Sequence, residues 1–358
     1  MSVTYPYEEL LRRTNAVLRS FGYTEEEASL TARVLVEADA RGVPSHGVGR
    51  LGPYSTFIEN KFINPGRTPE VVYETPVSLV VDGHNGVGGL IADFAVSRTI
   101  EKAAASGAAF CAVRDASHYG MAGLWTERIA QSGMIGFSCC TTRCNAIPTG
   151  GKTRLFGTDP ISVAIPEEDG AMFLLDMATT TAAFGKVEVY ARRGKTMPEG
   201  WAVDSAGRTQ RDPAAFLREY KAEPGLGGLV FLGGASEETG GHKGYGLGLL
   251  VELLSAGLSL GAWSLHSYTK GVGAKVCLFF GALRLDLFGS ERALRAHIGD
   301  ILREVRQSEP ADEGGRIYIH GEKEREARER ALRDGVLLDD ASAAALEKFY
   351  AQAQQPRS

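Results

Sequence analysis

The sequence predicts a mixed α/β protein with more than one subdomain. The first seventy residues carry apolar side chains at helical spacing, whereas from residue 71 short strand-like apolar runs alternate with helical segments. A chain of 358 residues is long enough to bury a large core. Its hydrophobic content of 44% and charged content of 23% are those of an ordinary globular protein, which argues against a disordered or fibrous class.

Two helices are expected first. Segment 7–21 has apolar residues at helical spacing, and Gly22 follows it as a C-terminal glycine. Thr24 and Glu27 form a capping box that opens the second helix, which ends before Pro44. The residues after Pro44 therefore lie just beyond a rigid element.

Strands and helices alternate in the rest of the chain. Strands are expected at 71–73, 78–81, 108–113, 134–139, 161–165, 172–175 and 229–232. Helices are expected at 90–105, 122–132, 182–193, 245–258, 322–334 and 341–350. The strands at 78–81 and 108–113, joined by a helix, form one βαβ-like unit.

Two segments are expected at the surface. Segment 195–228 is rich in proline, glycine and charge, which is typical of a surface excursion. The helix at 322–334 is densely charged, and Glu324 with Arg328 and Glu326 with Arg330 stand at i,i+4. This pattern predicts a solvated helix with ion pairs along its own face.

Charge and cysteine content narrow the function. A net charge of −5 argues against a nucleic-acid partner, which would need a clustered basic surface. Five cysteines, an odd number, are interpreted as reduced thiols rather than a disulfide framework or metal cluster. Residues 1–14 show no apolar export signal, and the apolar segment 246–265 contains Glu252 and several glycines. We therefore expect a cytoplasmic protein without a membrane span.

The common cofactor motifs are absent. Gly151, Lys152 and Thr153 resemble the end of a phosphate-binding loop, but Ala146 occupies the position of the required first glycine. The glycine-rich segments 83–89 and 244–248 do not fit G-x-G-x-x-G, and no H-E-x-x-H zinc motif occurs. No metal site is predicted.

The first constellation suited to chemistry is Ser45, His46, Arg50 and Tyr54. If the segment is helical, the last three side chains share one face. Histidine can exchange a proton near neutral pH, and an arginine fork can hold a carboxylate. The alternative is a surface loop, because Pro53 and nearby glycines oppose a helix.

Three further constellations follow strands or open helices. Ser117, His118, Tyr119 and Gly120 follow the strand at 108–113, where α/β proteins commonly place ligand groups. Hydroxyls and free backbone N–H groups at 176–180 could receive a phosphate or a ribose, although an ordinary helix cap is the simpler interpretation. His242 and Lys243 open an apolar helix against its dipole, which favours an anion there.

Together these segments resemble the malate/L-lactate dehydrogenase family, which includes ureidoglycolate, sulfolactate and 2,3-diketogulonate enzymes and Δ1-piperideine-2-carboxylate reductase. The likeness runs from about residue 5 to about 340. The matching residues are Ser45-His46-Gly47 with Arg50 and Tyr54, Ser117-His118-Tyr119-Gly120, Gly157-Thr158-Asp159-Pro160, Asp176-Met177-Ala178-Thr179 and His242-Lys243-Gly244-Tyr245-Gly246-Leu247. The sequence His320-Gly321-Glu322 departs from the family's usual Pro-Gly-Glu.

The resemblance implies a homodimer whose cofactor domain is built on a largely antiparallel mixed sheet rather than a Rossmann fold. It implies a helical domain of 1–72 with 322–358, an α/β domain of 73–118 with about 260–320, and a NAD(P)-binding domain of 119–259. NAD or NADP would contact a set of residues along one cleft. These are His118, Tyr119, Gly120, Met121, Ala122, Asp176, Met177, Ala178, His242, Lys243, Gly321 and Glu322.

The activity implied is hydride transfer between NAD(P)H and a small 2-oxo acid, giving a 2-hydroxy acid. His46, oriented by Ser45, would be the proton donor, although in some members the histidine at the position of His118 has this role. Arg50, Tyr54 and Thr158 would bind the substrate. The alternatives are an imine reductase acting on cyclic 2-carboxy imines and a non-catalytic dinucleotide-binding protein.

Overall fold

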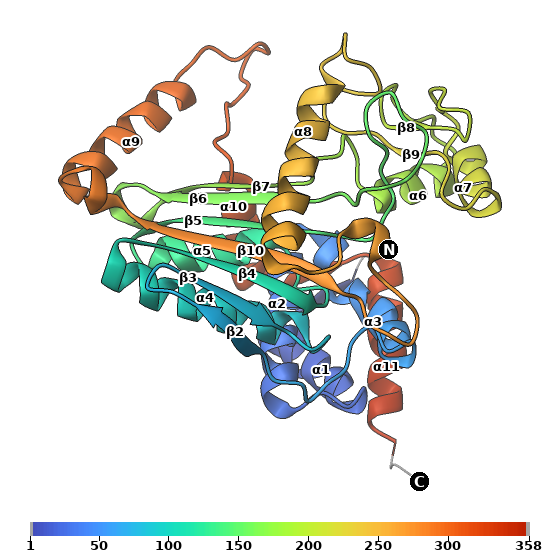
Figure 1. Cartoon of the computed structure of the whole chain (residues 1–358), viewed down its shortest axis with the longest axis horizontal. Coiled ribbons are helices and arrows are strands. Elements are labelled where there is room, and N and C mark those ends of the chain that lie inside the picture. The colour runs from blue at the N-terminus through green and yellow to red at the C-terminus, as the bar shows by residue number, and fades with distance from the viewer. Residues whose placement is uncertain (1–2, 356–358) are drawn as a thin grey trace.

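A computed structural model describes residues 3–355 and shows a mixed α/β fold around a seven-stranded sheet (Figure 1). The strand order is β2-β3-β4-β10-β5-β6-β7, in which β3 and β4 are parallel and the other neighbours are antiparallel. The strands are β2 (Glu70–Glu74), β3 (Ser78–Asp82), β4 (Ala108–Ala116), β5 (Met134–Cys140), β6 (Ile161–Pro166), β7 (Met172–Met177) and β10 (Val276–Arg284).

The predicted βαβ unit is confirmed. Helix α4 (Gly88–Ser106) joins β3 to β4, whose parallel register pairs Leu79 with Cys111. Helices α4 and α5 (Ala122–Gln131) cover the lower side of the sheet in Figure 1. Because α4 and α5 each begin beyond the carboxyl end of a strand, the turns before them gather at one edge of the sheet.

The central strand β10 lies outside the sequence predictions. It comes late in the chain, yet it pairs with β4 on one side and β5 on the other, so that Phe280 is opposite both Cys111 and Ser138. Its first seven residues are all buried. A continuous apolar run lacks the alternation that marks a half-exposed strand, and this explains why the pattern did not reveal it.

The upper side of the sheet carries α8 (Gly241–Glu252), which continues into a wider π-helical turn at Leu253–Gly257 (Figure 1). Val251 packs with Ala112, Cys139 and Phe279 of the sheet beneath it. The predicted helix at 245–258 is therefore confirmed in type, and it begins four residues earlier.

The N-terminal and C-terminal segments share one core. Helices α1 (Tyr7–Ser20), α2 (Glu25–Ala40) and α3 (Leu51–Glu59) pack with α10 (Glu322–Asp334) and α11 (Asp340–Ala353). Strand β1 (Val3–Tyr5) pairs with β11 (Val336–Leu338) and ties the two ends together. The predicted capping box is present, with the Thr24 hydroxyl accepting from Glu27 N and the Glu27 carboxylate accepting from Thr24 N.

The expectation of a surface excursion at 195–228 is wrong. This segment contains β8 (Ala202–Val203) and α7 (Pro213–Ala222), and it buries Met197, Trp201 and Phe216 in a core shared with residues outside the segment, such as Phe156 and Phe231. Helix α6 (Phe184–Arg192) packs on α7. The segment 195–228 is therefore packed, because burial of its aromatic and methionine side chains stabilises it despite its high proline and glycine content. The strand expected at 229–232 is also shorter, since β9 covers Gly228–Leu229 alone and pairs with β8.

The ion pairs expected within α10 are replaced by pairs to other elements. Arg328 donates to Glu37 on α2, and Glu326 accepts from Arg316 in the preceding loop. The helix is therefore anchored to its neighbours rather than fully solvated. Helix α9 (Glu291–Arg306), which the sequence did not predict, lies near one end of the sheet. Among residues 3–355, no helix has the length and apolarity needed to cross a membrane.

Candidate active site

A cavity of about 480 Å³ lies where the predicted segments meet. Its walls come from the turn after α2, the turn before α5, the end of β7 and the segment before α10. The structure brings twelve of the predicted residues to these walls. They are Ser45, His46, His118, Tyr119, Gly120, Met121, Ala122, Thr158, Asp176, Met177, Ala178 and Gly321.

The turn that carries His46 is not one helix. A 3₁₀ turn at Pro44–His46 is followed by extended backbone at Gly47 and by a second 3₁₀ turn at Val48–Arg50, which runs into α3. Asp39 on α2 anchors this arrangement, because its carboxylate accepts from Val48 N at 2.7 Å. A Cβ atom at Gly47 would overlap the same carboxylate, so glycine is required at that position.

Despite this break, Tyr54 and both predicted histidines meet. The imidazole rings of His46 and His118 stack with centroids 5.5 Å apart and planes inclined by 20°. The Tyr54 hydroxyl lies 2.7 Å from Nδ1 of His118, and Gly120 N donates to the same nitrogen at 3.4 Å. The Ser45 hydroxyl lies 2.9 Å from Nδ1 of His46.

Both imidazoles are neutral at physiological pH. Burial, followed by the nearby charge of Arg50, lowers the pKa of His46 to about 4. The same two causes, with His46 as a third, hold the pKa of His118 well below its ordinary value. Burial raises the pKa of Tyr54, so its phenol keeps its proton and donates. Nδ1 of His118 therefore accepts, and the ring carries its proton on Nε2.

Arg50 lies beside the histidines, outside the cavity wall itself. Its Nε donates to the Ser45 carbonyl at 2.5 Å, which leaves the two terminal amino groups of the fork for a carboxylate. Its charge acts on His46, His118 and Tyr54, which places it within electrostatic reach of the stacked rings.

The opposite wall offers hydroxyls. Thr158 N donates to Oγ1 of Thr142 at 2.7 Å, and the two threonine hydroxyls lie 3.3 Å apart. Both residues line the cavity. Thr142 was not predicted, although it follows β5 at a strand end, the position that had indicated His118. Other lining residues missed by the sequence are Cys140, Tyr268, Tyr318 and Lys323.

Asp176 ends the cavity near the start of α5. One of its oxygens accepts from Gly123 N at 2.7 Å, and burial raises the pKa of this carboxyl to about 6. Met121, at the N-terminus of α5, makes no capping hydrogen bond of its own, so Asp176 is the side chain that bonds to the first turn of this helix. The first turn of this helix therefore presents backbone N–H groups beside a carboxylate, a combination that suits the phosphate and ribose groups of a dinucleotide.

Three predicted cofactor residues lie elsewhere. His242 and Lys243 are exposed on the first turn of α8 and do not line the cavity. Glu322 is buried and accepts from Arg306 Nε at 2.6 Å and from Ile319 N at 3.1 Å. Its carboxylate therefore shapes the loop at Gly321 rather than facing the cavity.

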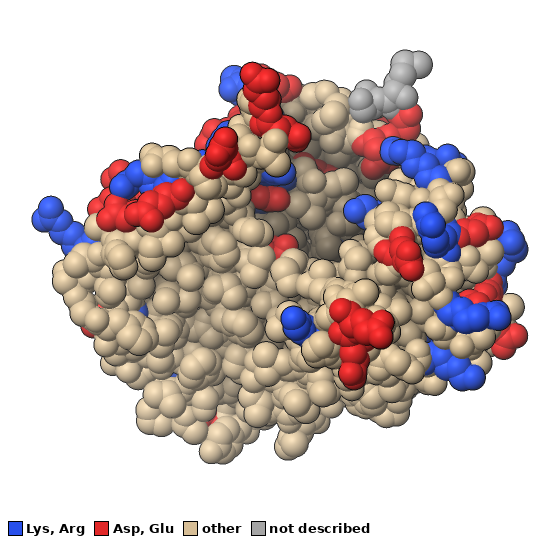
Figure 2. Space-filling view, turned by 90° about the horizontal axis from the view of Figure 1, so that it is seen from above, with Lys and Arg blue, Asp and Glu red and all other residues tan. Residues whose placement is uncertain are grey.

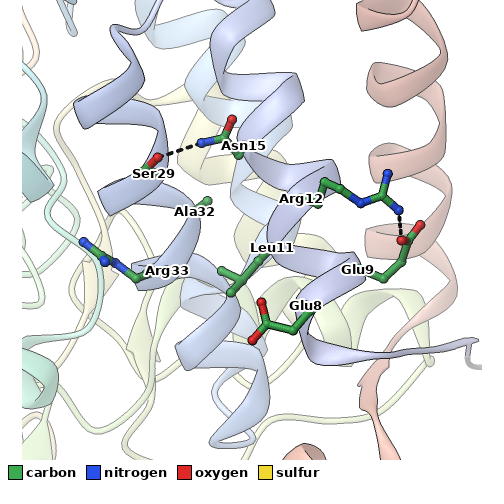
Figure 3. A pocket seen from close by; sticks show the side chains of 8 residues that line it. All are labelled: Glu8, Glu9, Leu11, Arg12, Asn15, Ser29, Ala32 and Arg33. Carbon is green, nitrogen blue, oxygen red and sulfur yellow. Dashed lines mark hydrogen bonds and ion pairs between the residues drawn. The ribbon is translucent and has the colours of Figure 1, made fainter.

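A second hollow, of about 520 Å³, lies between α1 and α2 (Figure 3). Its polar side chains bond to one another, as Asn15 does to Ser29 at 3.0 Å, and Arg33 points outward. None of its residues lines the first cavity, and it contains no histidine. It lacks the groups that acid–base chemistry needs.

Comparisons with known proteins identify the family and agree with this fold. A family model described as malate/L-lactate dehydrogenase matches residues 5–347. The chain is 39% identical to a malate dehydrogenase of Pyrococcus abyssi, over 90% of this chain and 87% of that protein. It is 36% identical to an L-sulfolactate dehydrogenase of Methanocaldococcus jannaschii, over 90% and 89%.

A solved structure of similar shape is the malate dehydrogenase of Entamoeba histolytica. It superposes with a TM-score of 0.93 at 30% identity and covers 100% of this chain and 99% of that one. The sheet, the cavity and the sequence likeness over nearly the whole chain lead to one conclusion. The chain belongs to the malate/L-lactate dehydrogenase family.

Proposed function

We propose that this protein is an NAD(P)H-dependent oxidoreductase that interconverts a small 2-oxo acid and the corresponding 2-hydroxy acid. The observation that carries the proposal is the pair of stacked, neutral imidazoles in a cavity beside Arg50. A 2-oxo acid needs a proton donor at its carbonyl and a cation at its carboxylate, and this cavity offers both. The malate and sulfolactate named in the relatives are acids of this class.

His118 is the better placed of the two proton donors. Two hydrogen bonds fix Nδ1 as an acceptor, so Nε2–H is the proton that can pass to the developing alkoxide. The imidazole stays neutral in this step because the Tyr54 hydroxyl gives its proton to Nδ1, and Tyr54 then regains a proton from solvent. His46 receives one contact from Ser45, whose hydroxyl can turn, and its tautomer is free. The hydrogen bonds thus favour His118 over His46, the residue that the resemblance placed first.

Substrate and cofactor would divide the cavity between them. Arg50 would hold the substrate carboxylate, with Tyr54 behind the ring of His118 and the Thr142 and Thr158 hydroxyls across the cavity. Residues of the Met121 turn, Asp176–Ala178 and Gly321 would bind NAD or NADP, which supplies the hydride when bound. His242 and Lys243 would contribute only if the cofactor reached beyond the cavity.

We also propose that two copies associate through α8. Leu247 and Leu250 are exposed on α8, Leu253 is exposed at the start of the π-helical turn that continues it, and Leu258 and Leu260 follow at 56% and 87% exposure. Figure 2, seen from above, shows few charged side chains over the centre and lower half of the face in view. An apolar patch of this kind marks a protein interface, and a second copy would cover it symmetrically.

The domain organisation and the cellular location are also proposals. We infer the division into a helical domain (1–72 with 322–358), an α/β domain and a cofactor domain whose sheet is not of the Rossmann type. The shared core of the two chain ends supports the helical domain, and the largely antiparallel sheet supports a cofactor domain that is not of the Rossmann type. Strand β5 of the cofactor domain pairs with β10 of the α/β domain, so these two domains share one sheet. All five cysteines are free thiols, which suits a cytoplasmic location.

The test is oxidation of NADH and of NADPH with oxaloacetate, pyruvate, sulfopyruvate, 2,3-diketogulonate and Δ1-piperideine-2-carboxylate. Turnover of one oxo acid supports the dehydrogenase and names the substrate. Turnover of the cyclic imine alone makes the protein an imine reductase. Cofactor binding without turnover of any of the five would contradict the proposed substrate class.

A further inference from the structure

Two buried carboxyl groups meet behind the threonine wall of the cavity. Asp159, in the turn before β6, is fully buried, and Glu252, in the last turn of α8, is 3% exposed. Ser264 bridges them: its hydroxyl donates to Asp159 Oδ1 at 3.3 Å, and its backbone N–H donates to the two oxygens of Glu252 at 3.2 and 3.3 Å.

The pair is bonded by neutral donors. Besides Ser264, Asp159 accepts from Thr142 N and Gly157 N, each at 3.2 Å. The charges of the pair act on four thiols, namely Cys139 and Cys140 on β5, Cys144 in the following loop and Cys277 on β10. The charge of Arg154 also acts on Cys144, but no hydrogen bond or ion pair between Arg154 and either carboxyl group is found among the described residues. Burial raises the pKa of every one of these thiols, so they are uncharged.

Two buried carboxylates without a cation cannot both be ionised, because each raises the free energy of the other's charged form. Burial, and then the charge of Glu252, hold the pKa of Asp159 well above its ordinary value, and burial also raises the pKa of Glu252. The stable arrangement is one proton between two carboxyl groups, as in other close carboxyl pairs.

This pair is connected to the cavity through Thr142. Asp159 Oδ1 binds Thr142 N, and the Thr142 hydroxyl lies 3.5 Å from the same oxygen. The Thr142 hydroxyl in turn accepts from Thr158 N. Asp159 itself has a φ of 37°, in the left-handed region that aspartate adopts more readily than most residues, and the surrounding hydrogen bonds hold it there.

We propose that Asp159 and Glu252 share one proton and that Asp159 is a positioning residue, which holds the Thr142 and Thr158 hydroxyls in place for an anionic substrate. The inference rests on the proposed function, in which these hydroxyls face the substrate. Loss of the shared proton would put a second negative charge behind the threonine wall. That charge repels a carboxylate substrate, so the KM of the hydroxy acid rises at alkaline pH while the cofactor Kd stays constant.

The experiment measures hydroxy-acid oxidation against pH, with the substrate identified in the panel above. In this direction Nε2 of His118 must accept the hydroxyl proton, so the His118–Tyr54 pair must first lose a proton; protonation of this pair lowers activity toward acid pH and does not raise KM at alkaline pH. Asp159→Asn and Glu252→Gln each mimic the protonated partner. Each should keep kcat/KM within about threefold at neutral pH and remove the alkaline rise in KM. Asp159→Ala leaves Thr142 unsupported and should raise KM about tenfold to hundredfold with a smaller change in kcat.

Glu27→Gln is the matched control. Glu27 is 1% exposed and accepts from backbone N–H groups of Thr24 and Gly66 in the helical core, away from the cavity. This variant should keep the wild-type alkaline profile. If Asp159→Asn kept that profile too, or lost as much activity as Asp159→Ala, the proposal would be overturned.

A second readout needs no substrate. At neutral pH the infrared carbonyl band of buried protonated carboxyl groups, to which Asp39 and Asp176 also contribute, should lose intensity in the Asp159→Asn, Glu252→Gln double variant relative to wild type and keep its intensity in Glu27→Gln. An unchanged band in the double variant would overturn the shared proton. A loss of intensity in a protein that turns over none of the panel would support the shared proton and contradict the proposed substrate class instead.

Discussion

The hydroxyl of Tyr54 lies 2.7 Å from Nδ1 of His118, a residue 64 positions further along the chain. This hydrogen bond joins α3, in the helical core, to the end of β4, in the sheet. It fixes the tautomer of a catalytic candidate from a different layer of the protein. The relative placement of the two layers therefore decides whether His118 holds its proton on the nitrogen that can reach a substrate.

Tyr54→Phe removes this bond and keeps the ring. His118 can then exchange tautomers, so we expect kcat for oxo-acid reduction to fall by about tenfold with little change in KM. Steady-state kinetics with saturating NADH or NADPH measure both. A rise in KM at constant kcat would show instead that Tyr54 binds substrate directly.

His118→Ala should lower kcat by about 10²–10⁴, the usual cost of a lost proton donor. His46→Ala should cost about tenfold, because His46 packs against the donor and is not itself fixed by two hydrogen bonds. Quenching of tryptophan fluorescence by NADH checks that both variants still bind cofactor. If His46→Ala lowered kcat more than His118→Ala did, His46 and not His118 would be the proton donor.

Arg50→Lys replaces a planar fork with a single ammonium group. We expect KM for the oxo acid to rise about tenfold to hundredfold, with the cofactor Kd unchanged. Arg33→Lys serves as the control, because Arg33 is exposed on α2 and does not line the active-site cavity. Equal effects of the two substitutions would show that Arg50 acts only through general surface charge.

Asp39→Asn tests how the Ser45–Arg50 turn is anchored. Burial raises the pKa of Asp39 from 3.8 to about 7. Between these values the native state holds a proton that the unfolded chain has released, so stability falls as the pH rises through this window. Asparagine still accepts from Val48 N and carries no charge. The free energy of unfolding of the variant relative to wild type should therefore increase from about pH 4 to about pH 7 and level off above it. Urea unfolding at several pH values measures this difference, and a constant difference would contradict the assignment.

Leu250→Asp combined with Leu253→Asp places two charges on the exposed side of α8. We expect the dimer to dissociate, as measured by light scattering after gel filtration. Leu332→Asp is the control, because Leu332 is similarly exposed but lies on α10. A wild-type protein that is monomeric would contradict an interface at α8. So would a double variant that remains dimeric while Leu332→Asp becomes monomeric.

Local patterns predicted most of the regular elements. Helical spacing, the Thr24–Glu27 capping box and the βαβ order identified α1, α2, β3, α4 and β4 within a few residues. These patterns depend on neighbours in sequence. Strand β10 and the packed segment at 195–228 depend on contacts with distant residues, so composition alone misrepresents them.

In the site, too, local sequence patterns predicted some residues, whereas contacts between distant segments determine others. Local patterns pointed to Ser45, His46 and His118, and the family resemblance added Thr158; all four line one cavity. The sequence could not show that Asp39 fixes the turn, that Thr142 faces Thr158, or that Glu322 bonds to arginines instead of opening to the cavity. Each of those contacts joins elements brought together by the fold.

The late position of β10 has a consequence for biosynthesis. As the chain leaves the ribosome, β4 and β5 are both complete long before residue 276 is made, and the strand that belongs between them does not yet exist. Two unpaired strand edges are then open at once to other chains. A nascent chain that stalls before Val276 should therefore aggregate or recruit chaperones, and the sheet can close only when the last quarter of the protein arrives.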